Sequence, residues 1–436
     1  MGERSFSSIV LGAHPREGRS RRLYRAGEVS EVCGDLATVR VDVDDSGQQV
    51  CLERLQVLGP WAVQPGDWVE LGYLDDSPNS VYVRSPLFSE TRDPALGFKA
   101  RLTVGDWDAV VDVNGGADYT SIQQALDAGH KTIFVRKGTH SLGAPGLVIS
   151  NANTILAGES WAETVLDFGG TTGYLQVNAD RCTLANLKLT GSQNTTYGAL
   201  RIAGGFAVVR HCLFDSNYRH LYTDSGWTSQ HALLLANEMR NASGAIAALN
   251  GLSVRLVGNL ITGGAVRDLV LYGTTPLLVG NTIWYATVSV QTIHAGLSSN
   301  GFYYARVSLA AGANRATIIG NTFSSAQGTA IEVASDLNSV AGNAIYGATS
   351  RGLYVTGSRN SIIGNVVASA GASGIAVTGN RNIVQANQLH DSANYGAHVM
   401  AGATNNIVAN NVALGNVSGQ VLDEGTGTVL DNNVTS

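Results

Sequence analysis

The feature that most constrains this chain is a short repeat in its second half. Two apolar residues followed by Gly and Asn recur at Leu256–Asn259, Leu278–Asn281, Ile318–Asn321, Val340–Asn343 and Ile362–Asn365. Related asparagines occur at Asn237, Asn387 and Asn410, and the step is 22 residues from 237 to 281 and again from 321 to 387. A repeat this short cannot bury its apolar face alone, so each repeat is expected to form one coil that stacks on its neighbours.

The segments between the turns have the pattern of strands. They alternate apolar and polar residues over short stretches, as in Gly352–Thr356, which excludes a helical solenoid. Coils paired as strands lie ~4.8 Å apart, so the asparagines are expected to stack in a ladder with amide hydrogen bonds along the axis. Looser equivalents extend the series to Glu159, Asn186 and His211 upstream and to Asn432 downstream. The sequence predicts an all-β parallel β-helix.

The composition agrees with a solenoid that has a neutral surface. Hydrophobic residues make up 44% of the 436 positions and charged residues only 14%, while glycine occupies 52. No apolar stretch approaches the ~18 residues of a membrane span, and the first residues lack a signal-like apolar run, so we expect folding in a cytoplasm without membrane insertion. The four cysteines lack metal-ligand spacing and are predicted to be reduced. No metal site and no cofactor are predicted.

A short amphipathic helix is predicted at 120–128, before the first coil. Thr120 and Gln123 have the spacing of a capping box, three apolar residues share one face, and Gly129 follows as a C-terminal glycine. The segments DYTSIQQAL (118–126) and IFVRKGTH (133–140) resemble the N-terminal cap of the pectin-lyase-like superfamily. This resemblance implies a right-handed parallel β-helix over 110–436. It leaves the activity open, because the superfamily includes lyases, hydrolases, esterases, epimerases and viral tailspikes.

The N-terminal region has a different texture. Strands are predicted at 36–43, 49–52, 68–71 and 81–83, so residues 21–90 are expected to form a small OB-like or SH3-like barrel. The segment VQPGDWVELGYL (63–74) resembles the OB-type modules of phage baseplate and spike proteins, which attach a receptor-binding body to the tail. Residues 1–20 form a basic arm, expected to dock on an acidic protein surface rather than on nucleic acid. Residues 91–109 are predicted to be a connector.

Alignment of the coils places a stripe of outward side chains at one phase. It consists of Arg201, Tyr222, Glu332, Tyr354 and His398, with the small residues Ala247 and Ala376 between them. Such a stripe suits an extended polymer, since aromatic rings contact sugar faces and charged groups contact hydroxyls or uronates.

Two steps of the repeat are longer than 22 residues and are rich in aromatic and titratable side chains. The step from His211 to Asn237 and the 40-residue step from Asn281 to Asn321 are therefore interpreted as inserts on a binding face. The alternative is that their aromatic residues pack the inserts or form a subunit contact. The predicted substrate-binding residues are Arg201, Tyr218, Arg219, His220, Tyr222, Trp227, His231, Tyr303, Tyr304, Arg306, Tyr354 and His398.

Two carboxylate pairs are candidates for glycoside hydrolysis, which uses acids ~5 to 9.5 Å apart. They are Asp215 with Asp224, and Glu332 with Asp336. The alternative is that all four are hydrogen-bonded turn residues. A pectinolytic lyase is disfavoured, because the array has few acids, no lysine after Lys188, and neither the WIDH nor the QDTL motif of pectate lyases and pectinesterases.

These observations and the resemblance favour a phage tailspike. The predicted protein attaches to a tail or baseplate through its N-terminal module and binds a host surface polysaccharide, with depolymerisation left open. It is expected to be made in the host cytoplasm, to reside in the virion and to form a homotrimer, as tailspikes usually do. The alternatives are a free-standing lyase, hydrolase or epimerase acting on carbohydrate, and a non-catalytic virion spacer.

Overall fold

The computed structural model describes residues 25–33, 36–42, 49–57, 67–73, 81–89, 107–226 and 231–435. The predicted basic arm (1–20), most of the predicted connector (91–109) and Trp227 lie outside these residues. Contacts divide the chain into two units, Met1–Trp107 and Asp108–Ser436. The two units are described separately below.

The first unit contains a closed barrel of five strands in the order β1-β2-β3-β5-β4. The strands are β1 (Arg25–Cys33), β2 (Leu36–Asp42), β3 (Gln49–Val57), β4 (Asp67–Tyr73) and β5 (Val81–Ser89). Antiparallel pairing of β1 with β4 closes the barrel, whereas β3 pairs with β5 in parallel. β1 was not predicted, and β3, β4 and β5 extend beyond the predicted strands.

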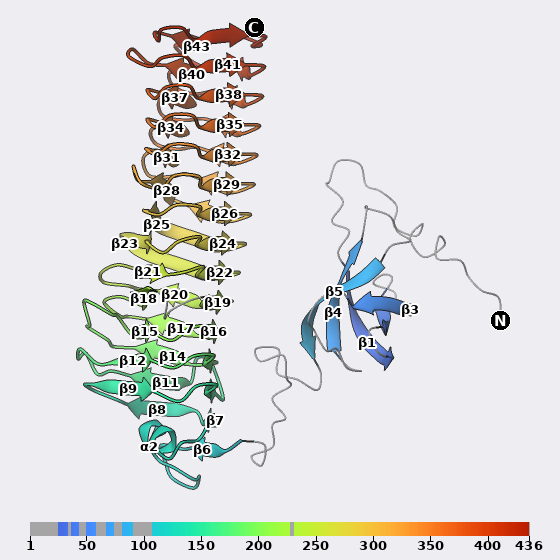
Figure 1. Cartoon of the computed structure of the whole chain (residues 1–436), viewed down its shortest axis with the longest axis vertical. Helices are drawn as coiled ribbons and strands as arrows, with labels where there is room; N and C mark the ends of the chain where they lie inside the picture. Colours follow the sequence, from blue (N-terminus) through green and yellow to red (C-terminus); the bar gives the residue numbers. More distant parts are fainter. Residues whose placement is uncertain are drawn as a thin grey trace, which may run out of the picture. The chain divides into compact units, whose positions relative to one another are not determined.

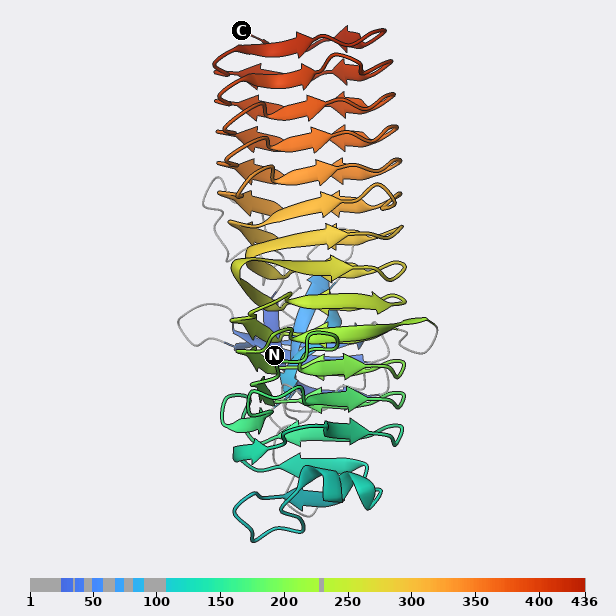
Figure 2. The same cartoon turned by 90° about the vertical axis from the view of Figure 1, so that its left-hand side faces the viewer.

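The second unit is an all-β parallel β-helix, as predicted, in which the coils between the first and the last contribute strands to three faces (Figures 1 and 2). Face 1 is a 15-stranded sheet. Its strands are β6 (Ala109–Val111), β7 (Thr132–Val135), β10 (Ile155–Gly158), β13 (Thr183–Ala185), β16 (Val208–Arg210), β19 (Leu233–Leu235), β22 (Arg255–Val257), β24 (Leu277–Val279), β26 (Gly296–Ser298), β29 (Thr317–Ile319), β32 (Ser339–Ala341), β35 (Ser361–Ile363), β38 (Ile383–Gln385), β41 (Ile407–Ala409) and β44 (Val429–Asp431).

Faces 2 and 3 follow face 1 in each coil and share two long strands, β23 (Leu260–Leu271) and β25 (Thr282–Val290). The other strands of face 2 are β8 (Gly138–Ser141), β11 (Thr164–Asp167), β14 (Lys188–Thr190), β17 (Leu213–Asp215), β20 (Glu238–Arg240), β27 (Gly301–Tyr303), β30 (Thr322–Ser324), β33 (Ala344–Tyr346), β36 (Val366–Ala368), β39 (Gln388–His390) and β42 (Val412–Leu414). Those of face 3 are β9 (Gly146–Ile149), β12 (Tyr174–Val177), β15 (Leu200–Ile202), β18 (Leu221–Gly226), β21 (Ala247–Gly251), β28 (Arg306–Leu309), β31 (Ile331–Val333), β34 (Leu353–Val355), β37 (Ile375–Val377), β40 (Tyr395–Val399) and β43 (Gly419–Asp423).

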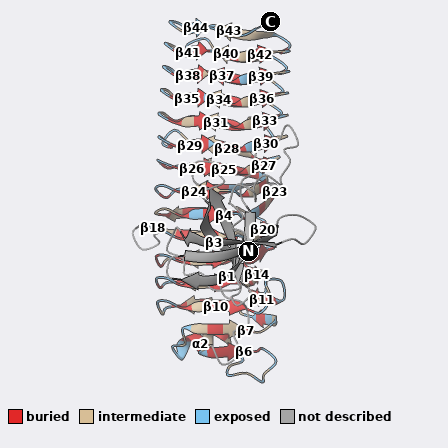
Figure 3. Cartoon of the chain, turned by 90° about the vertical axis from the view of Figure 1, so that its right-hand side faces the viewer, coloured by how far each residue is buried: buried red, intermediate tan, exposed pale blue. Residues whose placement is uncertain are grey.

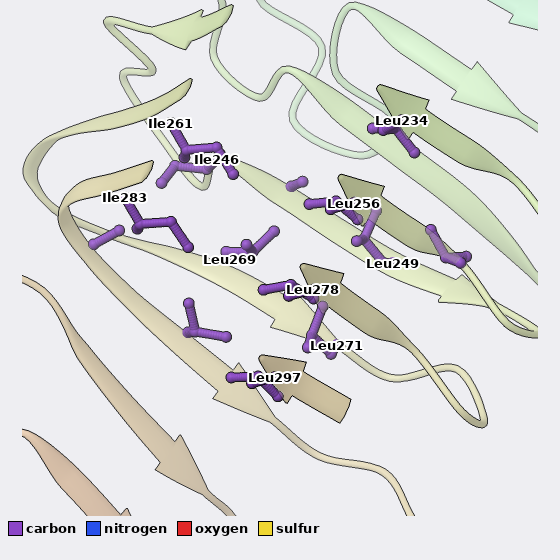
Figure 4. Close-up of a cluster of buried hydrophobic side chains, with 14 of the residues drawn as sticks. Leu234, Ile246, Leu249, Leu256, Ile261, Leu269, Leu271, Leu278, Ile283 and Leu297 are labelled. Atoms are coloured by element: carbon purple, nitrogen blue, oxygen red, sulfur yellow. The ribbon is translucent and has the colours of Figure 1, made fainter. Parts of the chain in front are cut away.

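Inward side chains form the core by stacking on the same position of the next coil. Leu256 pairs in register with Leu278, and Leu278 with Leu297, and all three are fully buried (Figure 4). On face 2, Ile261 stacks on Ile283 in the same way. Buried and partly exposed residues alternate along the short strands, because successive side chains of a strand point to opposite sides of the coil wall (Figure 3). The core therefore runs along the inside of the whole β-helix.

The predicted asparagine ladder is present at the corner between faces 1 and 2. It runs through Asn237, Asn259, Asn281, Asn300, Asn321, Asn343, Asn365, Asn387, Asn411 and Asn433. In each pair, the backbone N–H and the side-chain Nδ2 of one asparagine donate to Oδ1 of the next, both at 2.9 Å for Asn259 and Asn281, for example. A second ladder, which was not predicted, runs from Asn338 through Asn360 and Asn382 to Asn406 at the corner between faces 3 and 1.

Four residues that were predicted to continue the ladder lie one residue before the ladder position instead. Asn186, His211, Asn410 and Asn432 have φ angles of 48 to 55°, like the glycines of the repeat, such as Gly342 at 61°. They occupy the left-handed position just before the ladder, which glycine and asparagine adopt most easily. The ladder passes through the residues after Asn410 and Asn432, which are Asn411 and Asn433, whereas Leu187 and Cys212 follow Asn186 and His211 and precede the first ladder asparagine. Glu159 is not in the ladder, and its carboxylate accepts a hydrogen bond from the Lys137 N–H.

The 40-residue step from Asn281 to Asn321 is not an insert. Asn300 belongs to the ladder, at 19 residues from Asn281 and 21 from Asn321, so the segment forms two ordinary, slightly short coils. Asn300 does not follow the Gly-Asn motif of the repeat, because Ser299 rather than glycine holds the left-handed position before it, with a φ of 55°. The aromatic residues of this segment therefore lie on regular strands.

The capping helix is α2 (Ile122–Asp127), and Ile122, Ala125 and Leu126 are buried as predicted. Gly129 has the positive φ of 86° expected after a helix. The predicted capping box is absent, since the N-cap is Ser121 and makes no side-chain hydrogen bond. The Gln123 side chain instead accepts a hydrogen bond from the Val148 N–H, which attaches the helix to the coil beside it. Its amide nitrogen donates to Asp127 within the helix.

Candidate functional site

The outward residues of face 3 form one continuous row. Strand register aligns Gln176, Arg201, Tyr222, Ala248, Val270, Ser289, Ser308, Glu332, Tyr354, Ala376, His398 and Leu422. The five residues of the predicted stripe therefore share one row. The small residue between Tyr222 and the following coils is Ala248 rather than Ala247, which is buried and inward. We call these twelve residues the face-3 row.

Three tyrosines gather at the N-terminal part of the face-3 row. The Tyr197 ring lies 5.3 Å from Tyr174 and 5.4 Å from Tyr222, measured between ring centroids, and it meets Tyr222 edge to face. Tyr174 begins β12, Tyr222 lies in β18, and Tyr197 comes from the turn before β15. All three rings are partly exposed. Successive coils thus present a cluster of aromatic edges and faces to solvent.

Arg201 connects this cluster to a carboxylate. Its guanidinium carbon lies 4.3 Å from the centre of the Tyr197 ring. Its Nε and Nη2 donate to the two oxygens of Asp224 at 2.9 and 2.6 Å, which is a bidentate pair. The hydrogen bonds to Asp224 raise the pKa of the guanidinium further above its already high value. Both side chains are about one-fifth exposed, so part of each can be reached from solvent.

A second group of polar residues occupies the C-terminal part of the face-3 row. Glu332 pairs in register with Tyr354, whose ring lies beneath the Arg351 guanidinium at 4.4 Å. Two coils further on, His398 Nε2 is 2.9 Å from the carboxylate of Glu424. Five strand spacings separate Tyr222 from Glu332, or ~24 Å. The outward residues between them are short: Ala248, Val270, Ser289 and Ser308.

His220 was predicted to contact a ligand, and this prediction is wrong. Its side chain is fully buried, with Nδ1 3.3 Å from the Asn217 amide and the ring beside Phe214. Burial lowers the pKa of His220 to about 4, although the charge of Asp215 opposes this shift. The corner before β18 places two successive residues, His220 and Leu221, inside the coil. The period-two alternation assumed for strands does not hold there.

The other predicted residues of this coil point to different places. Tyr218 covers Gly244 of the next coil, where an added Cβ would lie 2.6 Å from the Tyr218 ring. Arg219 donates to the carbonyl of Thr196 and so braces the turn that carries Tyr197. His231 stacks on Phe206 at 5.1 Å, in the turn between faces 3 and 1. These three residues lie outside the face-3 row.

The second aromatic-rich segment forms stacked pairs rather than a loop. Trp284 stacks on Tyr303 at 4.4 Å, and Tyr285 stacks on Tyr304 at 4.9 Å. These rings lie on face 2 and at its corner with face 3, and not in the face-3 row. Arg306 is on face 3, where its Nε donates to Thr287.

Three of the four candidate carboxylates are hydrogen-bonded to other groups of the chain. Asp215 lies on face 2, in a different strand from Asp224, and accepts hydrogen bonds from Ser216, Arg240 and Asn241. Burial alone would raise the pKa of Asp215, but these hydrogen bonds outweigh it and hold the pKa below its usual value.

Asp336 is a turn residue. Its carboxylate accepts the backbone N–H of Ser358 in the next coil, which is the alternative role considered for it. Among the described residues, Glu332 is the candidate acid whose carboxylate makes no hydrogen bond or ion pair within the chain.

Tyr174, Tyr197 and Arg351 were not predicted to belong to the site. Tyr197 lies in a turn, so no strand periodicity identifies it, and Arg351 precedes its strand. The clue available in the sequence was the spacing of Tyr174, Tyr197 and Tyr222 by nearly one coil each. A coil-by-coil alignment of aromatic residues would have identified that column.

No described helix is long and apolar enough to span a membrane. Cys182 and Cys212 are buried free thiols, as predicted, and burial raises the pKa of Cys212 to about 12.

The comparison with protein-family models supports the β-helix. A family model described as "Right handed beta helix region" matches residues 305–436. No curated protein matches the sequence. Among solved structures, the catalytic unit of a thermostable α-1,3-glucanase from Streptomyces thermodiastaticus is 14% identical, with a TM-score of 0.49 over 95% of this chain and 88% of that one. Tailspike protein 3 of bacteriophage CBA120 is 13% identical, with a TM-score of 0.48 over 93% and 73%. The A-module of the mannuronan C-5 epimerase AlgE6 from Azotobacter vinelandii is 14% identical, with a TM-score of 0.39 over 75% and 98%.

Proposed function

We propose that this protein binds an extended polysaccharide along the face-3 row. The observation that carries the proposal is the column of Tyr174, Tyr197 and Tyr222 beside the Arg201–Asp224 pair. Aromatic rings offer apolar surface to the C–H face of a sugar, and a partly exposed guanidinium and carboxylate offer directional hydrogen bonds to its hydroxyls. The three tyrosines come from successive coils along the axis, which suits a polymer that lies along the β-helix.

The length of the row supports a polymer rather than a single sugar. Tyr354, with the Arg351 guanidinium over its ring, lies six strand spacings from Tyr222, or ~29 Å. The side chains between the two groups are short, so the middle of the row projects less from the β-helix than its two ends. One saccharide chain can therefore contact both groups while lying along the β-helix.

The geometry favours binding over cleavage. Asp224 is hydrogen-bonded to Arg201, Asp336 to a backbone N–H of the next coil and Asp215 to Arg240, and structural roles of this kind support binding rather than hydrolysis. Hydrolysis by an acid pair at ~5 to 9.5 Å would need a second carboxylate near Glu332. Depolymerisation is the second candidate function, and release of new reducing ends from a bound polysaccharide is the assay that distinguishes it.

Removal of two rings tests the proposed site. We expect Tyr197→Ala combined with Tyr222→Ala to weaken binding to the recognised polysaccharide by about 10-fold or more, since a stacked aromatic contact contributes ~0.5 to 1.5 kcal/mol beyond its buried area. Tyr272→Ala is the matched control, because Tyr272 is an exposed tyrosine outside the row. Binding of labelled chain to whole cells and to purified surface polysaccharides provides the readout. Equal affinity of the double variant and the control would contradict the proposal.

We further propose that the protein acts in a phage virion, attached to the tail or baseplate through its N-terminal module. Support comes from the closed barrel of β1–β5, whose five strands and parallel β3–β5 pairing suit an OB-like module. Residues 21–90 alone should then bind a tail or baseplate protein, which a pull-down with purified virion proteins can measure. A free-standing enzyme would show no such binding.

We propose a homotrimer associated through face 1. From β24 to β41 the outward residues of this face include no charged side chain, and four isoleucines there (Ile319, Ile363, Ile383 and Ile407) are exposed. Identical neutral faces meet without like-charge repulsion, and a patch of this kind marks an interaction site. Sedimentation at micromolar concentration should give the mass of three chains, and Ile363→Glu should reduce it. A one-chain mass for the parent would contradict the proposal.

A further inference from the structure

Four aromatic residues form two adjoining stacks on consecutive coils of face 2. Trp284 and Tyr303 are stacked with an angle of 16° between their planes, and Tyr285 and Tyr304 with an angle of 4°. The two stacks are neighbours, since Trp284 lies 6.3 Å from Tyr285 and 6.4 Å from Tyr304. We call these four residues the face-2 aromatic stack.

The stack ends abruptly at both sides because the neighbouring coils carry small residues. In register, Thr262 precedes Trp284, and Ser324 follows Tyr303. At the corner, Ser325 follows Tyr304, and its N–H begins the pairing with the next coil. The ring faces of Tyr303 and Tyr304 that point toward these serines therefore meet no further ring on the neighbouring coil.

Stability alone does not explain the two corner tyrosines. Tyr285 and Tyr304 both have a φ of 51°, in the left-handed region that costs a bulky residue about 1 kcal/mol or more. Most other coils place Gly, Ser, Asn or Asp at this corner, including Gly191, Asn241, Gly347 and Asp391. Both tyrosines are nonetheless more than one-third exposed. Two strained and solvent-exposed rings are better explained by contact with a ligand than by packing.

The chemistry around the stack is neutral and rich in hydroxyl groups. On these coils face 2 contributes Thr282, Gly301, Thr322, Ala344 and Tyr346 beside the stack, with no charged side chain. Thr322 is exposed, and Ser324 and Ser325 are partly exposed next to the uncovered ring faces. Flat apolar surface next to hydroxyls matches an uncharged pyranose, whose C–H face stacks on a ring while its hydroxyls bond to serine and threonine.

We propose that the face-2 aromatic stack is a second saccharide site, which takes an uncharged hexopyranose unit against Tyr303 and Tyr304 above Ser324 and Ser325. The inference rests on the proposed polysaccharide function, but its residues are separate from the face-3 row. Because the two sites lie on different faces, one protein molecule engages two segments of polysaccharide. The gain is avidity: a polymer that reaches both sites binds more tightly than a short oligosaccharide.

Two variants of the full chain test the site in opposite ways. Tyr303→Ala with Tyr304→Ala removes the stacking surface, whereas Ser324→Tyr extends the stack and covers the exposed face of Tyr303. Isothermal titration with methyl glycosides of glucose, galactose and mannose, and with neutral oligosaccharides from the recognised polysaccharide, measures affinity. Both variants should lose about 10-fold or more in affinity for the best of these ligands. Ser324→Tyr should keep the melting temperature of the parent or raise it, and Tyr272→Ala should bind like the parent.

The outcomes separate this inference from the proposed function. If the face-2 variants lose binding while Tyr197→Ala/Tyr222→Ala retains the neutral oligosaccharide, the second site is established. If only the Tyr197/Tyr222 variant loses binding, the inference is overturned and the face-3 proposal stands. Retained binding in all variants overturns both. If Tyr303→Ala/Tyr304→Ala instead lowers the sedimentation mass and leaves sugar binding intact, the stack is a subunit contact and the inference fails.

Discussion

Replacement of a single ladder asparagine should destabilise its own coil strongly, and Asn343 is the best position for the test. Its side chain takes part in four hydrogen bonds in a fully buried setting. Nδ2 donates to the Ile318 carbonyl at 2.8 Å and to Asn365 Oδ1 at 2.9 Å. Oδ1 accepts from the backbone N–H and from Nδ2 of Asn321, both at 3.0 Å.

The magnitude follows from what Asn343→Ala leaves behind. The N–H of Asn321 loses its acceptor inside the corner, which costs about 1 to 3 kcal/mol for a buried unpaired donor. The other three hydrogen bonds contribute about 0.5 to 1.5 kcal/mol each. The free energy of unfolding of this region should therefore fall by about 2.5 to 7.5 kcal/mol. Asn394→Ala is the control, since that side chain is exposed and makes no hydrogen bond among the described residues, and it should change stability by less than about 0.5 kcal/mol.

Amide hydrogen exchange is the appropriate assay, because coils of a solenoid open locally and one global midpoint would average over them. Protection of the Asn321 and Asn365 amides should fall in Asn343→Ala and remain in Asn394→Ala. Protection near residue 133, far along the β-helix, should be the same in both. If Asn343→Ala exchanges like Asn394→Ala at these amides, the ladder does not stabilise the coils and the reasoning is refuted.

Three further predictions concern stability and reactivity. Burial lowers the pKa of His220 to about 4, below its unfolded value of ~6.5. The free energy of unfolding should therefore fall by about 3 kcal/mol as the pH drops from ~6.5 to 4. In denaturant melts, His220→Leu should flatten this dependence on pH. Gly379→Ala should lower the free energy of unfolding by about 3 kcal/mol or more, because its Cβ would lie 1.7 Å from the Gly357 carbonyl oxygen. Gly364→Ala is the control, since its Cβ meets open space and it should lose only the ~1 to 2 kcal/mol of its left-handed φ. Equal melting temperatures of the two variants would contradict this. Cys182 and Cys212 should react with iodoacetamide at pH 8 only after denaturation, as peptide mass spectrometry can show, and rapid labelling of the native chain would mean that the coil wall opens.

Prediction from sequence succeeded where side chains repeat once per coil. The interval between ladder asparagines and the shared row of Arg201, Tyr222 and Tyr354 follow from a period that strand pairing imposes. The errors arose where one residue substitutes for another with the same backbone preference. Ser299 replaced a glycine, so Asn300 was missed and two coils were mistaken for an insert.

The candidate site was harder to predict because corners and turns do not follow strand alternation. His220 was assigned outward, although the corner buries it together with Leu221. Tyr197 reaches the face-3 row from a turn, and its position depends on the brace from Arg219 to Thr196. The pairing of Asp224 with Arg201 also depends on which coils are adjacent. A single sequence reveals this adjacency only once the register of the strands is known.

The asparagine ladder also has a polarity. At every step from Asn237 to Asn433, the coil nearer the N-terminus donates two N–H groups and the coil nearer the C-terminus supplies the accepting Oδ1. The amide dipoles therefore add along the axis, and aligned hydrogen bonds polarise one another. A finished coil presents two unpaired donors to the segment that leaves the ribosome next, and the asparagine of that segment can accept both at once. In this direction each coil can serve as the template for its successor in the order of synthesis.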